Sequence, residues 1–158
     1  MTARIAVLAS GRGSNLQAVL TAIAGGQIDA DVVGVFSDKP EAPALGLVPA
    51  YRRWSARPRD FADRAAFDAA LGDALDAVRP DWILCAGYMR ILGAPLVQRF
   101  AGRMINIHPS LLPLYKGLDT HARAIAAGDA EHGASVHFVV PALDAGTVLA
   151  QARVPVQA

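Results

Sequence analysis

The chain has 158 residues, the length of one domain, and folding at this length buries about 70% of the unfolded surface, enough for a hydrophobic core. Fifteen Lys and Arg residues against fourteen Asp and Glu residues leave a net charge of +1, which excludes the charge excess that attracts a whole protein to nucleic acid or to an anionic membrane. Gly, Pro, Ser or Gln interrupts the apolar stretches well before the roughly 20 residues that span a bilayer. Cys85 is the only cysteine, which favours a reducing, cytoplasmic location.

The first part of the chain has the pattern of a strand, a glycine-rich turn, a helix and a second strand. Residues 5–9 form a short apolar run that ends at the turn. Apolar residues then recur at helical spacing until residues 25–26, which are both glycine. Residues 31–36 form a second apolar run, closed by turn-forming residues. This order predicts a βαβ unit with parallel strands.

The rest of the chain continues this alternation. Asp60 is the candidate N-cap of a long amphipathic helix that ends before Pro80, and a shorter helix is expected over residues 120–128. Four further apolar runs have the length of strands: 82–86, 104–108, 135–140 and 148–154. Only a loop separates the last two runs, so we expect that pair to be antiparallel. The sequence therefore predicts one α/β domain over residues 1–158, with a mainly parallel Rossmann-like sheet, helices on both faces and a late antiparallel strand pair.

The turn after the first strand is a candidate phosphate site. Gly11 and Gly13 allow the backbone to turn sharply, and the following helix presents free N–H groups to an anion. A dinucleotide fingerprint needs a third glycine where this chain has Leu16, so a single phosphate is favoured over a pyrophosphate. Ser14 and Asn15 can add side-chain hydrogen bonds. The alternative is a structural turn in which Ser14 or Asn15 caps the helix.

Asn106 and His108 stand at the end of the strand predicted over residues 104–108. Alternation along a strand points both side chains to one face, while Ile105 and Ile107 face the core. Open α/β sheets bind ligands at the carboxyl ends of their strands, and an amide donor beside an acid–base imidazole suits acyl transfer. A lone histidine at a strand end is commonly structural, but the neighbouring amide favours the functional interpretation.

Asp144 lies in the loop between the two late strands. A carboxylate in this place can orient His108 and favour its protonated form. The spacing along the sequence does not show that the two side chains meet. The alternative is that Asp144 is a turn residue that precedes Gly146.

These motifs resemble those of the phosphoribosylglycinamide formyltransferases of purine synthesis. The resemblance runs from the first strand to the carboxyl end of the chain and rests on five motifs in a fixed order: Gly13-Ser14-Asn15, Asn106-Ile107-His108-Pro109-Ser110-Leu111-Leu112-Pro113, Tyr115-x-Gly117, Ser135-Val136-His137-Phe138-Val139 and Leu143-Asp144-x-Gly146. It implies transfer of a formyl group from 10-formyltetrahydrofolate, as cosubstrate, to the amine of glycinamide ribonucleotide.

The resemblance also implies roles for single residues. The implied catalytic residues are Asn106, His108 and Asp144. The implied ligands of the ribonucleotide phosphate are Gly13, Ser14 and Asn15. The implied folate contacts are Arg64, Met89, Arg90, Ile91, Leu92 and Asn106. The substrates are expected to be small molecules, with no metal, no nucleic acid and no membrane as partner.

A physical argument supports the folate segment. Met89, Ile91 and Leu92 follow a strand end and offer soft apolar surface to a flat pterin ring, and Arg64 and Arg90 can meet carboxylate or ring acceptors. The alternative is that this segment is ordinary core and that Arg64 is an exposed helix residue.

The other candidate side chains receive simpler interpretations. Cys85 is interpreted as a packing residue, and His132 and His137 as structural. The resemblance keeps His121 near the site as a supporting group.

Three features depart from the family's pattern. Asp119 stands where the family commonly has His and adds a negative charge near the expected site. Thr147 follows Gly146 where the family usually has Pro. The third expectation is that the chain, which ends at Ala158, lacks the family's carboxyl-terminal segment, so that the last apolar run is left open to self-association.

Two other functions remain as alternatives. A formyltetrahydrofolate deformylase-like hydrolase shares the Asn, His and Asp set. A noncatalytic phosphate- or nucleotide-binding domain belongs to a different class, and binding of ligand without formyl transfer would indicate it.

Overall fold

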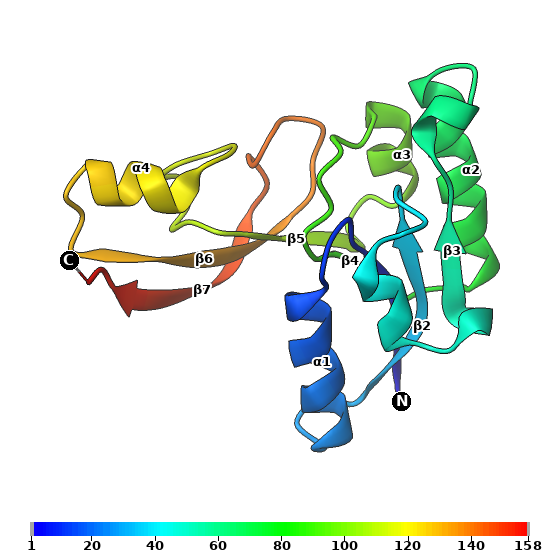
Figure 1. The fold of residues 1–158 in the computed structure, drawn as a ribbon, viewed down its shortest axis with the longest axis horizontal. Helices are drawn as coiled ribbons and strands as arrows, with labels where there is room; N and C mark the ends of the chain where they lie inside the picture. Colours follow the sequence, from blue (N-terminus) through cyan, green and yellow to red (C-terminus); the bar gives the residue numbers. More distant parts are fainter. Residues whose placement is uncertain (1, 158) are drawn as a thin grey trace.

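A seven-stranded mixed sheet forms the centre of the computed structural model, which describes residues 2–157 (Figure 1). The strands lie in the order β3-β2-β1-β4-β5-β6-β7. Their bounds are Ala3–Leu8 (β1), Ala30–Ser37 (β2), Arg53–Ser55 (β3), Trp82–Cys85 (β4), Met104–His108 (β5), Glu131–Phe138 (β6) and Val148–Pro155 (β7). Strands β1 to β5 are parallel, and β6 and β7 join antiparallel. The predicted mainly parallel sheet with a late antiparallel pair is confirmed.

Helices cover both faces of the parallel part of the sheet. The α-helices are Ser14–Ala24 (α1), Arg64–Ala77 (α2), Ala94–Arg99 (α3) and Thr120–Ala126 (α4), and the short 3-10 helices are Pro43–Leu47 (η1), Ala50–Arg52 (η2) and Pro58–Asp60 (η3). Helices α2 and α3 pack on one face, and α1 lies with η1 on the other (Figure 1). None of the helices in residues 2–157 is long and apolar enough to cross a membrane.

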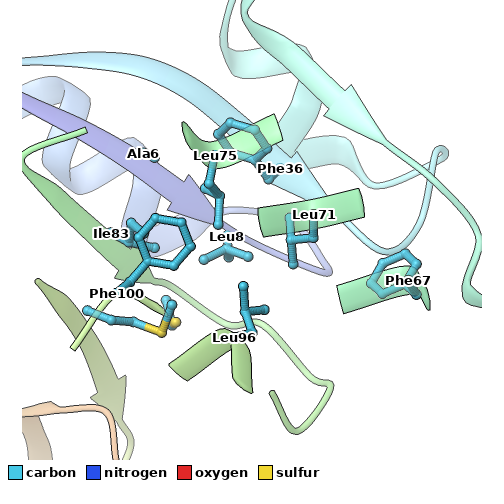
Figure 2. Packing of buried hydrophobic residues seen from close by; sticks show 11 residues of the cluster. Ala6, Leu8, Phe36, Phe67, Leu71, Leu75, Ile83, Leu96 and Phe100 are labelled. Atoms are coloured by element: carbon cyan, nitrogen blue, oxygen red, sulfur yellow. The ribbon is translucent and has the colours of Figure 1, made fainter. Parts of the chain in front are cut away.

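The core under α2 and α3 consists of large side chains that are almost fully buried (Figure 2). Leu8 of β1 and Ile83 of β4 belong to one cluster with Phe67 of α2 and Phe100, the residue after α3. Burial of a side chain of this size contributes about 1.5–3 kcal/mol. Val7, between two residues of this cluster, faces the core on the α1 side. Because both faces are buried, the central strands hold a fixed position beneath the loops that follow their carboxyl ends.

The starts of α2 and β6 differ from the predicted starts, the first because of helix capping and the second because of strand pairing. Helix α2 begins with Asp63 as its N-cap, whose carboxylate accepts a hydrogen bond from the Ala66 N–H at 2.8 Å. The predicted cap, Asp60, lies instead in η3. The strand predicted over residues 135–140 starts earlier, because its pairing with β7 begins at Glu131.

The sequence pattern missed β3 and α3, and it extended α4 too far. Strand β3 has three residues and α3 has six, with Pro95 in its first turn, so both are too short for a pattern of apolar spacing to be recognised. Helix α4 ends at Ala126 rather than at residue 128.

The antiparallel strands β6 and β7 extend away from the helices that cover the parallel part of the sheet, with α4 beside them (Figure 1). All eight residues of β7 are exposed. Strand β6 thus connects this outer part of the molecule to β5.

The Asp63→Ala variant should lose the N-cap of α2, and we expect its free energy of unfolding to fall by about 1 kcal/mol. Asp60→Ala is the matched control, since it removes a carboxylate from the preceding turn without removing a cap. Thermal unfolding followed by circular dichroism measures both changes. Equal losses in the two variants would contradict the assignment of Asp63 as the cap.

Candidate active site

A cleft of about 1070 Å³ opens at the carboxyl ends of β4 and β5. Most of its lining comes from four segments: residues 87–92, 106–109, 117–122 and 139–144. Single residues complete it: Asn15, Cys85, Val97, Ala134 and His137. Parallel strands all place their carboxyl ends at one edge of the sheet, and this edge is where open α/β sheets bind ligands. The topology therefore gathers loops from distant parts of the sequence around one cleft.

Strand β5 presents Asn106 and His108 to this cleft. Ile105 and Ile107 pack against the core on the α1 side, while Met104 is buried in the core under α2 and α3. Alternation along the strand then turns Asn106 and His108 to the cleft face, as predicted, and both residues line the cleft.

Asp144 reaches the same place from the loop between β6 and β7. Its Oδ2 lies 3.5 Å from His108 Nδ1 and accepts a hydrogen bond from the Gly117 N–H at 3.0 Å. The side chains of His108 and Asp144 are each 6% exposed. Gly146 allows the loop to turn back closely, because a Cβ at this position would come within 1.7 Å of the Phe138 carbonyl oxygen. The structure thus brings Asp144 next to the motif that contains Asn106 and His108.

Both ring nitrogens of His108 face hydrogen-bond acceptors. Nε2 lies 2.8 Å from the Tyr115 carbonyl oxygen, which can only accept, so Nε2 carries a hydrogen. Nδ1 faces the Asp144 carboxylate, which also only accepts when it is ionised. Both ring nitrogens are thus directed at oxygen atoms, which fixes the orientation of the imidazole in the cleft.

His137 is a site residue that the sequence analysis interpreted as structural. Its Nε2 lies 3.3 Å from Asn106 Nδ2 and 3.7 Å from Asp144 Oδ1, and its Nδ1 lies 2.9 Å from the Phe138 carbonyl oxygen. That carbonyl requires a hydrogen on Nδ1, so in the neutral ring Nε2 accepts from the Asn106 amide. One N–H of Asn106 is then fixed and the other remains for a ligand.

His137 belongs to one of the five family motifs, but the motif gave it no role at the site, and its role follows from the pairing of β5 with β6. Asn106 pairs with His137 in this antiparallel register, so their side chains share a face. The role of His137 can therefore be inferred only when the strand partners and their register are known.

The predicted phosphate loop forms the N-terminus of α1. Gly13 is the N-cap residue and has a φ of 80°, in the left-handed region that favours glycine. A Cβ at Gly13 would lie 2.8 Å from the Cβ of Ala44, so close packing also requires glycine here. Ser14 and Asn15 are the first two residues of the helix, and both are exposed. The interpretation of Ser14 or Asn15 as the N-cap is therefore wrong, and the structure gives this helix, within residues 2–157, no side-chain cap that would occupy its free N–H groups.

The segment 89–92 forms an apolar wall of the cleft. Met89 and Ile91 are 62% and 63% exposed, whereas Leu92 packs against the core. The guanidinium of Arg90 lies 5.3 Å from the ring centroid of Phe67. These apolar side chains give the cleft a surface on which a flat ring can lie.

Arg64 stands behind this wall. It lies outside the set of described residues that line the cleft, and its guanidinium donates a hydrogen bond to the Ile91 carbonyl. Arg64 thus contacts the backbone of the apolar wall from the start of α2.

Cys85 lies at the floor of the cleft and is buried. Burial raises the pKa of its thiol to about 12, because the low-polarity surroundings disfavour the thiolate. Within residues 2–157, no group of three or more His, Cys, Asp or Glu side chains is placed to hold a metal ion.

The fold is a mainly parallel α/β sheet, and its cleft holds an amide, an imidazole and a carboxylate. This combination defines a class of protein suited to acyl transfer. The formyl transferase family profile matches residues 3–158. The chain belongs to the formyl transferase family.

Individual relatives are similar over nearly the whole chain. Phosphoribosylglycinamide formyltransferase of Escherichia coli (strain K12) is 48% identical over 156 residues, which cover 96% of this chain and 73% of the relative. The enzyme of the same name from Haemophilus influenzae is 46% identical over 157 residues, with 97% and 73% covered. The crystal structure of glycinamide ribonucleotide transformylase 1 from Symbiobacterium toebii superposes with a TM-score of 0.93 at 40% identity, over 99% of this chain and 75% of that one. The similarity in both sequence and fold confirms the predicted family.

The raised pKa of Cys85 predicts that this thiol is inert in the folded protein. At pH 8 a thiol with a pKa of about 12 holds almost no thiolate, so an aromatic disulfide reagent should react with it far more slowly than with a free cysteine. In guanidinium chloride the same thiol should react at the rate of an unfolded peptide. Absorbance of the released thiol measures both rates, and rapid labelling of the folded chain would show that Cys85 is accessible.

Proposed function

We propose that this chain transfers a formyl group from 10-formyltetrahydrofolate to the amine of glycinamide ribonucleotide, a step of purine synthesis. The observation that carries this proposal is the convergence of Asn106, His108 and Asp144 at the floor of one cleft. The names of the relatives that match nearly the whole chain support the choice of substrates.

We assign the two substrates to different walls of the cleft. The uncapped N-terminus of α1, with Gly13, Ser14 and Asn15, offers N–H groups and a helix dipole to the phosphate of the ribonucleotide, and of these three residues Asn15 lines the cleft. The apolar wall formed by Met89, Ile91 and Leu92 suits the pterin ring of the folate, and Arg90 adds a cation beside it. Arg64 acts on the folate site by holding the Ile91 carbonyl.

Direct transfer requires no covalent intermediate on the protein. The neutral amine of the ribonucleotide attacks the formyl carbon, and the negative charge that develops on the formyl oxygen is stabilised by the free N–H of Asn106 and the charge of His108. The bond from the formyl carbon to N10 of the folate then breaks. One proton leaves the attacking amine and one proton reaches N10, so the products are the formamide and tetrahydrofolate.

Asp144 supports both parts of this reaction. Its carboxylate stabilises the protonated ring of His108, and through a water it can accept the proton that leaves the amine. His137 orients the amide of Asn106 without contacting the reacting atoms. The folate is a cosubstrate, no residue is assigned to a metal, and we place the reaction in the cytoplasm.

An absorbance assay of folate product with and without glycinamide ribonucleotide tests the function. Formation of tetrahydrofolate only when the ribonucleotide is present is the expected result. Formation without the ribonucleotide would indicate a deformylase-like hydrolase instead. Binding of either ligand without any product would indicate a noncatalytic binding domain, and both of these outcomes contradict the proposal.

In the same assay, Asn106→Ala and His108→Ala should each lower kcat by about 10²-fold or more, because each removes a group that stabilises the developing oxyanion. His132→Phe is the matched control, since it preserves a buried aromatic ring that packs on Tyr115 and His121 and leaves the catalytic groups in place. Circular dichroism checks that all three variants fold. Wild-type turnover in either alanine variant would remove that residue from the mechanism.

The phosphate assignment predicts that Asn15→Ala raises the KM for the ribonucleotide by about tenfold and leaves the KM for the folate nearly unchanged, the effect of losing one hydrogen bond to a charged group. Gln17→Ala is the control, because Gln17 lies on the same helix and its amide contacts only Thr21 within residues 2–157. Gly13 is a poor probe, since its substitution strains the backbone and crowds Ala44. An equal rise in both KM values for Asn15→Ala would count against a phosphate at this helix.

A further inference from the structure

Ser10 and Asp38 form a buried polar pair that the proposed reaction does not use. Ser10 follows β1 and is 4% exposed, and Asp38 follows β2 and is 6% exposed. The Ser10 hydroxyl donates a hydrogen bond of 2.7 Å to Asp38 Oδ1. Burial of a carboxylate costs free energy unless hydrogen bonds compensate for the lost water.

The second contact of Ser10 reaches the wall of the cleft. Its hydroxyl oxygen accepts a hydrogen bond of 2.9 Å from the Met89 N–H, and its own N–H donates to the Gly87 carbonyl at 3.1 Å. The carboxylate of Asp38 can only accept, so the Ser10 hydrogen must point toward it and the oxygen lone pairs remain for Met89. Asp38 therefore orients the Ser10 hydroxyl so that its oxygen accepts the hydrogen bond from Met89 in the proposed folate wall.

Ser10 is also the residue that leads into the phosphate loop. The loop is fixed on its other side, where the Ala44 N–H donates to the Gly11 carbonyl at 3.0 Å and Gly13 packs against Ala44. Ser10 therefore bonds to the wall at Gly87 and Met89. The next residue, Gly11, lies in the phosphate loop and bonds to Ala44. One short segment of chain thus touches both substrate walls.

Tyr88, the residue before Met89, also lies within reach of the charge of Asp38. The Tyr88 hydroxyl is buried and has no hydrogen-bond partner within residues 2–157. Burial is the larger cause of its raised pKa, and the negative charge of Asp38 adds to the rise. Tyr88 lines the cleft, so the field of Asp38 extends to the wall segment that Ser10 holds.

We propose that Ser10 and Asp38 are positioning residues that couple the phosphate site to the folate wall, so that binding of one substrate raises the affinity of the other. This inference rests on the proposed function, because it uses the two ligands assigned there. Coupling of this kind is reciprocal, and about fivefold is the expected size.

The test measures the dissociation constant of tetrahydrofolate by calorimetry, with and without saturating glycinamide ribonucleotide, a pair that does not react. In the wild-type chain the ribonucleotide should tighten tetrahydrofolate binding, so that the ratio of the dissociation constant without ribonucleotide to that with it is about five. In Ser10→Ala this ratio should fall to about one, and the KM for the formyl folate should rise about tenfold while kcat changes by less than about twofold. Asp38→Asn keeps an acceptor for Ser10 and should retain the ratio, whereas Asp38→Ala should lose it.

Ser37→Ala is the matched control. Ser37 is 1% exposed at the end of β2 and accepts a hydrogen bond from the Lys39 N–H at 3.1 Å, so its loss removes a similar buried hydroxyl away from the wall. It should keep the wild-type ratio. Hydrogen exchange of the Met89 amide, measured by NMR, gives a readout that does not depend on activity: exchange should be faster in Ser10→Ala and unchanged in Ser37→Ala.

A wild-type ratio of one, an unchanged ratio in Ser10→Ala, or the same loss in Ser37→Ala overturns the coupling. If the wild-type chain transfers formyl groups but shows any of these results, the coupling alone fails. If the wild-type chain binds neither ligand, the proposed function fails and the coupling fails with it.

Discussion

The antiparallel pairing of β5 with β6 is the interaction on which the site depends. Its register places Asn106 beside His137, and the chain then continues from β6 into the loop that returns Asp144 to His108. A slip of one residue would turn His137 to the opposite face and separate it from the Asn106 amide. The parallel strands gather the loops at one edge, but this single antiparallel pair sets the distances among the polar groups. The change of strand direction at β6 is therefore a functional feature of the sheet.

The polar groups of the site are buried, largely out of contact with water. The side chains of His108, His137 and Asp144 are between 3% and 6% exposed, and burial of such groups is costly unless they are hydrogen-bonded. Here each of them contacts another member of the set or a backbone group, so their orientations are fixed before a substrate arrives. Such preorganisation is what stabilises charge in a transition state at little further cost. Two apolar cores, one on each face of the sheet, supply the stability that this arrangement requires.

The two ligands that we propose have opposite requirements, and different elements at the same edge of the sheet would meet them. A helix N-terminus offers N–H groups to an anion, and the segment after β4 offers an exposed apolar surface to a flat ring. The charge balance of the whole chain, +1, gives no general attraction to either ligand. Recognition is therefore local, and the hydrogen bonds of Ser10 are the direct link between the two walls.

The sequence by itself determined the features that repeat over short distances. Apolar runs identified six of the seven strands, the glycine at position 13 identified the turn before α1, and the spacing of Asn106 and His108 placed them on one face. The motifs also identified the family. The tertiary structure alone decided that Asp63 rather than Asp60 caps α2, that Arg64 holds the Ile91 carbonyl, and that His137 belongs to the site. The cap depends on the residue at which α2 starts, the Arg64 contact on the packing of α2 against the segment after β4, and the place of His137 on the register of β5 and β6. Packing of the whole chain fixes all three, and none of them leaves a periodic signal in the local sequence.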